Sequence, residues 1–101
     1  MDNPARPGAT GGRFAAFGAS KFALRGMAQA MARELGPQGI HVAHVVIDGV
    51  MWTPRTRAMM DLSEEACLIP EDVAAAYVSL IRQPRSAWTH ELDLRPDREP
   101  F

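Results

Sequence analysis

Residues 11–36 limit the possible folds of this chain more than any other stretch; they read GGRFAAFGASKFALRGMAQAMARELG. Large apolar residues recur at helical spacing from Phe17 to Leu35, and alanine fills most of the positions between them. Alanine favours helix and lets a neighbouring backbone approach closely. The Gly36-Pro37 pair then ends the run. We therefore expect one long helix over residues 13–36, buried on two sides against a sheet and another helix.

The remainder of the chain predicts two strands and a second helix. Residues 40–47, IHVAHVVI, form a short β-branched run that is typical of a strand covered on both faces. Residues 50–57 leave the carboxyl edge of that strand, and residues 58–68 are expected to be a mobile segment or a short helix. Pro70, followed by two acids, predicts a helix start. Residues 87–94, AWTHELDL, partly alternate between apolar and polar side chains and so predict a final strand.

This order of elements predicts an α/β fold. A right-handed crossover between the two strands makes them parallel. Two parallel strands do not cover a helix that is buried on two sides, and doubly wound sheets need several strands. The pattern is therefore that of the back half of a larger doubly wound parallel sheet. We divide the chain into a flexible leading loop (1–12), this partial domain (13–95) and a polar tail (96–101).

The composition narrows the classes of partner and compartment. Apolar residues make up 47% and charged residues 23%, which is typical of a globular chain. The net charge of -1 gives no reason to expect a nucleic-acid partner. No segment reaches 18 apolar residues, and the first 12 residues lack the apolar core of a signal peptide. The single cysteine, Cys67, fits a reducing compartment. We expect a soluble, cytoplasmic protein with no membrane partner.

Histidines, tryptophans and arginines outside the long helix are the other candidates for a metal, binding or interface site. His41 and His44 are three apart in the expected strand and would point to opposite faces, so we expect no metal site there or at His90. Trp52 and Trp88 are expected to pack or to lie at an interface. Four arginines late in the chain are expected on a solvated surface: Arg82, Arg85, Arg95 and Arg98.

Two segments resemble a known family. Residues 17–45, FGASKFALRGMAQAMARELGPQGIHVAHV, are similar to the active-site helix and following strand of the short-chain dehydrogenase/reductase family. Residues 48–54, DGVMWTP, resemble the family turn written PGxxxT, which lies against the nicotinamide. The resemblance spans residues 11–94 but only the C-terminal part of a complete member. It implies part of a Rossmann fold, NAD or NADP as cofactor, and hydride transfer on a carbonyl or an alcohol.

The resemblance also assigns roles on the long helix. The family helix carries Tyr-x-x-x-Lys, in which the tyrosine passes a proton and the lysine binds the nicotinamide ribose and lowers the phenol pKa through its charge. Lys21 stands at the lysine position and Phe17 at the tyrosine position. Phenylalanine has no hydroxyl and passes no proton. Tyr77, the only tyrosine, falls in the second predicted helix and is not an obvious substitute.

The turn and the start of the chain depart from the family as well. The resemblance implies that Asp48, Gly49, Val50 and Thr53 flank the nicotinamide, with Asp48 standing where the family usually has proline. The glycine-rich turn that binds the pyrophosphate is missing. The family serine is also not identifiable, and Thr10 is the only hydroxyl in the region where it is expected.

Two hypotheses for function follow from these residues. The first is a dehydrogenase/reductase present as its C-terminal portion, acting on a small-molecule substrate, with independent activity left open because two family motifs are missing. The second is a non-catalytic fragment, or a remnant of a truncated gene, that forms a homo-oligomer through the 13–36 helix. An exposed apolar helix face needs cover, which favours association.

Overall fold

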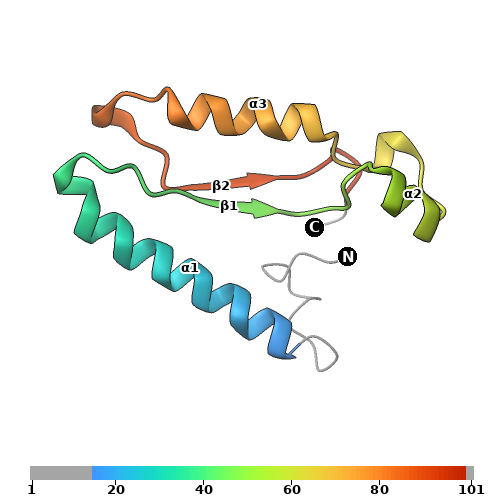
Figure 1. Cartoon of the computed structure of the whole chain (residues 1–101), viewed down its shortest axis with the longest axis horizontal. Helices are drawn as coiled ribbons and strands as arrows, with labels where there is room; N and C mark the ends of the chain where they lie inside the picture. The colour runs from blue at the N-terminus through green and yellow to red at the C-terminus, as the bar shows by residue number, and fades with distance from the viewer. Residues whose placement is uncertain (1–14, 100–101) are drawn as a thin grey trace.

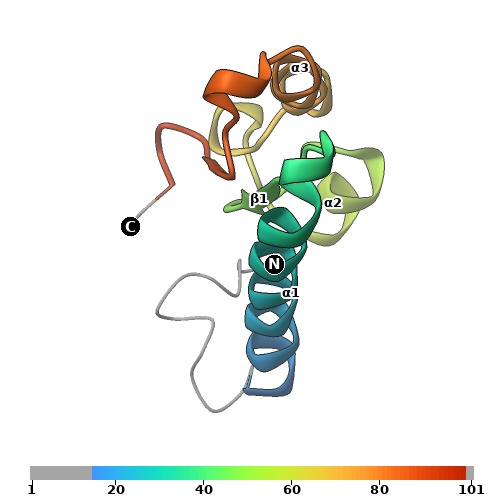
Figure 2. The ribbon, with the colours of Figure 1, turned by 90° about the vertical axis from the view of Figure 1, so that its left-hand side faces the viewer.

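The structure is a computed structural model, and it describes residues 15–99. Helix α1 (Ala15–Leu35) is followed by strand β1 (His44–Ile47), the short helix α2 (Pro54–Met59), helix α3 (Pro70–Ile81) and strand β2 (Glu91–Leu94). The two strands lie between α1 on one face and α3 on the other, as Figures 1 and 2 show from two sides. The predicted leading loop and the candidate Thr10 lie outside the described residues.

Helix α1 ends as the sequence predicts. A single 3₁₀ turn over Gly36–Gln38 follows it, and Gly39 adopts a positive φ of 87° while its N–H donates to the Gly36 carbonyl at 2.9 Å. The predicted burial of this helix on two sides is wrong. Its buried residues are Gly18 and Ala28, whereas Met27 is 54% exposed. The reason is that the sheet of the described residues has two strands and leaves much of α1 uncovered.

Strands β1 and β2 are parallel, which confirms the crossover predicted from the order of elements. The register pairs His44 with Glu91 and Ile47 with Leu94. One further rung follows β1, where the Asp48 N–H donates to the Leu94 carbonyl at 2.8 Å. Both strands therefore end at the same edge of the sheet, with the chain after β1 starting beside the end of β2 (Figure 1).

Each strand begins four residues later than predicted. The predictions were 40–47 and 87–94, but the second of these segments starts in a 3₁₀ turn, Arg85–Ala87, whose backbone is not extended. Because residues 85–87 are not extended, residues 40–43 have no strand to pair with there. Side chains of the two segments make contact instead. The His41 ring stacks on the Trp88 ring with 4.7 Å between centroids and an interplanar angle of 3°.

Helix α3 starts at the predicted residue. Pro70 occupies the first turn, where its missing N–H costs nothing, and Glu71 and Asp72 lie against the positive end of the helix dipole. Val73 and Leu80 are buried. The helix thus packs one stripe toward the sheet, as its apolar spacing predicts.

The core of the described residues is small. Its buried apolar members are Ala28, Val46, Cys67, Leu68, Val73 and Leu80, and no described side chain falls below 2% exposure. Large apolar side chains remain exposed on both helices: Phe22, Leu24, Met27 and Met31 on α1, and Tyr77, Val78 and Ile81 on α3. Apolar surface left open on both helices of a two-stranded parallel sheet is what a part of a doubly wound fold presents. None of the helices in residues 15–99 is long and apolar enough to cross a membrane.

Candidate functional site

The candidate site lies at the carboxyl ends of the two strands, where parallel α/β sheets bind ligands. The chain that leaves β1 is held there by a short parallel bridge between Met51 and Leu68. The Trp52 N–H donates to the Leu68 carbonyl, and the Leu68 N–H donates to the Val50 carbonyl, both at 2.8 Å. The segment from residue 50 to residue 52 is therefore held at both of its ends by Leu68 and does not form a free loop.

Thr53 caps helix α2. Its hydroxyl accepts from the Thr56 N–H at 3.2 Å, and the Thr56 hydroxyl accepts from the Thr53 N–H at 3.0 Å. Pro54 in the first turn completes this start signal. The threonine expected beside a nicotinamide is thus half-buried with its hydroxyl oriented by the cap.

Asp48 and Arg95 form an ion pair that the sequence analysis missed. The Asp48 side chain is 4% exposed, and its Oδ2 atom lies 3.2 Å from an Arg95 guanidinium nitrogen. The expected solvated surface is wrong for Arg95, whose side chain is 16% exposed. One signal could have found the pair. Each residue directly follows a predicted parallel strand, and the carboxyl ends of such strands meet at one edge.

Gly49 lies in contact with the chain that follows β2. Its φ is 151°, and a Cβ atom built there would lie 2.9 Å from Pro96 Cδ. Only glycine adopts this conformation without strain, and only glycine leaves room for the proline ring. The Asp48-Gly49 turn is therefore closely packed against the Arg95-Pro96 segment.

Lys21 and Phe17 lie together on α1. The Lys21 ammonium nitrogen is 5.6 Å from the centroid of the Phe17 ring, as the four-residue spacing requires. Lys21 is exposed and Phe17 is half-buried. The first turns of α1 lie toward the same end of the molecule as the carboxyl end of β1 (Figure 1). Among residues 15–99, no hydrogen bond or ion pair joins Lys21 or Phe17 to the turn after β1.

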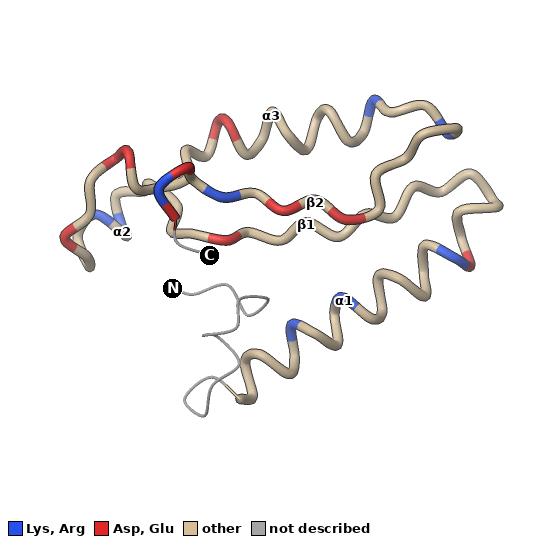
Figure 3. The backbone as a smooth tube through the Cα atoms, turned by 180° about the vertical axis from the view of Figure 1, so that it is seen from behind, with Lys and Arg blue, Asp and Glu red and all other residues tan. Residues whose placement is uncertain are grey.

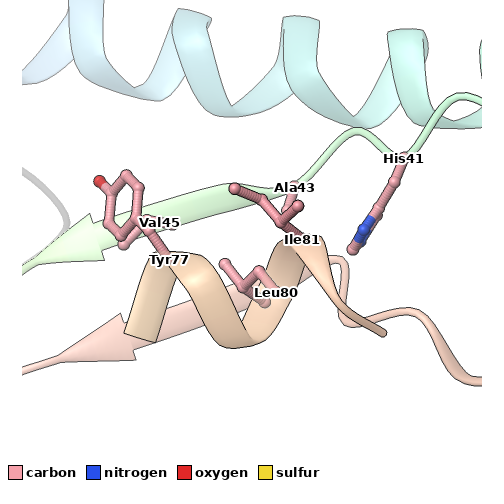
Figure 4. A pocket seen from close by; sticks show the side chains of 6 residues that line it. All are labelled: His41, Ala43, Val45, Tyr77, Leu80 and Ile81. Carbon is pink, nitrogen blue, oxygen red and sulfur yellow. The ribbon is translucent and has the colours of Figure 1, made fainter. Parts of the chain in front are cut away.

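Tyr77 does not replace the missing phenol beside Lys21. It belongs to α3, on the opposite face of the sheet from α1. There it lines an open apolar groove of about 360 Å³ together with His41, Val45 and Leu80 (Figure 4). The structure thus leaves the position next to Lys21 to the Phe17 ring.

Charged residues elsewhere join elements and do not form a single-sign surface. Figure 3 shows acidic residues on β2 with a basic residue just after the strand, and residues of both signs in and beside α2. Arg25 of α1 forms a two-point ion pair with Glu91 of β2: its Nε and one Nη atom each lie 2.8 Å from a carboxylate oxygen. His44 Nδ1 lies 3.7 Å from the same carboxylate. In the described part of the chain, no three His, Cys, Asp or Glu residues come together as a metal site.

Cys67 is a buried free thiol close to the carboxyl edge of the sheet. Burial raises the pKa of this thiol above its ordinary value of 9.0, and the nearby Glu99 carboxylate raises the pKa further. The thiol is therefore protonated and unreactive near neutral pH.

The fold and the site together are those of the C-terminal part of a doubly wound α/β domain. The sequence model of the short chain dehydrogenase family matches residues 8–64, more than half of the chain. The chain belongs to this family. A solved short-chain dehydrogenase from Rhodopseudomonas palustris is 44% identical to it and superposes with a TM-score of 0.65. That match covers 92% of this chain and 34% of the solved chain, so this chain spans about a third of that protein's length. No curated protein matches.

Proposed function

We propose that this chain forms the nicotinamide-facing part of an NAD- or NADP-dependent short-chain dehydrogenase. The reaction class is hydride transfer between the cofactor and a carbonyl or alcohol of a small molecule. The observation that carries the proposal is the turn over residues 48–53, which is fixed at the carboxyl edge of a parallel sheet in a chain of this family. We place the protein in the cytoplasm, which fits its unpaired Cys67.

The residues present fit the nicotinamide end of the cofactor. The missing side chain of Gly49 makes room for the Pro96 ring, which packs the turn against the chain after β2 and so holds residues 49–53 at the carboxyl edge of the sheet. The exposed Lys21 ammonium can donate to the hydroxyls of a ribose. Thr53 supplies an oriented hydroxyl. The cofactor supplies the hydride chemistry when bound, while these residues bind and orient it.

Phe17 changes what Lys21 does in this proposal. In the resemblance, the lysine charge lowers the pKa of a phenol, but a phenyl ring has no proton to lose. Lys21 therefore acts through binding alone, and the proton must come from a group other than residue 17. The ring holds the lysine instead, through its contact at 5.6 Å.

A titration of the purified chain with NADH and NADPH, monitored by calorimetry and by tryptophan fluorescence, tests the proposal. We expect binding in the millimolar range or tighter. Lys21→Met removes a charge-assisted hydrogen bond worth about 1.5–3 kcal/mol and should weaken binding by about tenfold to a hundredfold. Arg33→Met, an exposed cation on the same helix, is the matched control and should change nothing. Absence of binding by the folded chain would overturn the proposal.

A second candidate function, homo-oligomerisation through α1, rests on the apolar face of that helix. Leu24, Met27 and Met31 are 43%, 54% and 39% exposed. Surface of this kind marks association sites. We expect sedimentation at the mass of a dimer and a shift to monomer on Met27→Glu. Arg33→Glu, which changes a polar residue of the same helix, should leave the dimer intact. A monomer at all concentrations would refute this candidate.

A further inference from the structure

The turn over Asp48 and Gly49 is tied to the end of β2 in three different ways. The backbone tie is the hydrogen bond from the Asp48 N–H to the Leu94 carbonyl at 2.8 Å. The side-chain tie is the ion pair with Arg95 at 3.2 Å. The packing tie is the contact of Gly49 with Pro96. Consecutive residues of the turn are thus attached to consecutive residues after β2.

Arg95 extends this attachment to the chain beyond it. Its guanidinium also donates to the Glu99 carbonyl at 3.2 Å, and the Glu99 N–H donates to the Pro96 carbonyl at 3.1 Å. The segment from residue 96 to residue 99 is therefore a defined turn next to the site. Arg95 stands between that turn and Asp48 and holds both.

The chemistry of Asp48 explains why a charge pair is needed at this position. The Asp48 N–H needs a hydrogen-bond partner. The Asp48 carboxylate is also buried, and a buried carboxylate is costly unless a cation and hydrogen bonds compensate it. The Leu94 carbonyl accepts from the Asp48 N–H, and Arg95 places a cation 3.2 Å from the Asp48 carboxylate.

We infer that Asp48 and Arg95 act as a positioning pair that sets the backbone of residues 49–53 against the nicotinamide. In this role the pair acts through the turn that it holds, and we assign it no part in the transfer of the hydride or the proton. This inference rests on the proposed function for its ligand, while the restraint on the turn stands on the contacts alone.

Amide hydrogen exchange of the full chain, read by NMR, tests the restraint without any ligand. Asp48→Asn keeps the shape and removes the charge. Arg95→Lys keeps the charge and replaces the guanidinium, whose Nη2 atom contacts both the Asp48 carboxylate and the Glu99 carbonyl. We expect exchange at Trp52 and Leu68, whose N–H groups fix the turn, to accelerate by about tenfold or more in Asp48→Asn and by less in Arg95→Lys. The double variant Asp48→Asn, Arg95→Gln also loses the hydrogen bond from Arg95 to the Glu99 carbonyl, so it should exchange at least as fast as Asp48→Asn.

Asp93→Asn is the matched control, since it removes the same charge from an exposed residue of β2. It should leave the exchange at Trp52 unchanged. Equal exchange in Asp48→Asn and the unmodified chain overturns the inference. So does acceleration that is spread evenly over α1 and α3, because that result marks global destabilisation rather than a local restraint.

The affinity for NADH separates this inference from the proposed function. If the unmodified chain binds NADH, Asp48→Asn should weaken the binding by about fivefold to tenfold while Asp93→Asn leaves it unchanged. If Asp48→Asn accelerates amide exchange in the turn but leaves the affinity for NADH unchanged, the positioning role is overturned. If the unmodified chain binds no NADH, the proposed function fails together with the role toward nicotinamide, and the exchange data decide whether the pair restrains the turn.

Discussion

Replacement of Gly49 by alanine should destabilise the protein more than the same change at Gly26, Gly36 or Gly39. The φ of 151° is a conformation that side chains rarely adopt, and holding a residue there costs about 1–3 kcal/mol. The new Cβ would lie 2.9 Å from Pro96 Cδ, part of a ring that cannot swing away. Overpacking of this kind costs about 1–3 kcal/mol more. We expect the free energy of unfolding to fall by about 2–6 kcal/mol in total.

Urea unfolding followed by circular dichroism measures this loss, and Gly26 provides the matched control. Gly26 lies on α1 with no atom within 4 Å of a Cβ built there. Alanine at this position should stabilise the chain by about 1 kcal/mol through helix propensity. Adding Pro96→Ala to Gly49→Ala should recover the packing part of the loss and leave the backbone part. A Gly49→Ala chain within about 0.5 kcal/mol of the unmodified one would refute the reasoning.

Three further predictions concern the core, the ion pair between α1 and β2, and the buried thiol. Leu80→Ala should cost about 3 kcal/mol in urea unfolding, whereas the neighbouring Ile81→Ala, at a side chain that is 79% exposed, should change the stability by less than about 0.5 kcal/mol. Arg25→Met should cost at most about 1 kcal/mol, since Arg25 and Glu91 are 40% and 30% exposed, and the cost should shrink in 1 M salt, as a salt titration of the unfolding midpoint would show. Because burial and Glu99 raise the pKa of Cys67, the stability that this group contributes is present below the pKa of the unfolded thiol and is lost as pH rises through the folded pKa. Iodoacetamide should accordingly label Cys67 at pH 8.5 at least about tenfold faster in urea than in buffer, and equal rates would contradict its burial.

The features that the sequence predicted correctly are those determined by neighbouring residues. The end of α1 follows from Gly36 and the turn that leads from it to Gly39. The start of α3 follows from Pro70 and the two acidic residues after it. The proximity of Lys21 to Phe17 needs only the geometry of a helix. Parallel strands follow from the order of elements and the handedness of crossovers.

The features that the sequence did not predict depend on residues far apart in the chain. The apolar run that begins at Ile40 has strand character, yet strand pairing begins only where the partner segment, after the 3₁₀ turn at Arg85–Ala87, becomes extended. Arg95 resembles its exposed neighbours in sequence, and only the register of β1 against β2 brings it to Asp48. The exposure of Met27 depends on how many strands the sheet has, which no local pattern contains.

The register of the two strands has a consequence for how this chain folds. It pairs His44 with Glu91, which lies 47 positions further along the chain. Helix α1 can form within about a microsecond from contacts between neighbouring turns, but β1 gains its partner only after the chain has closed a loop that contains α3. We expect strand pairing to be the slow step of refolding, with the ion pair between Asp48 and Arg95 appearing in the same kinetic phase.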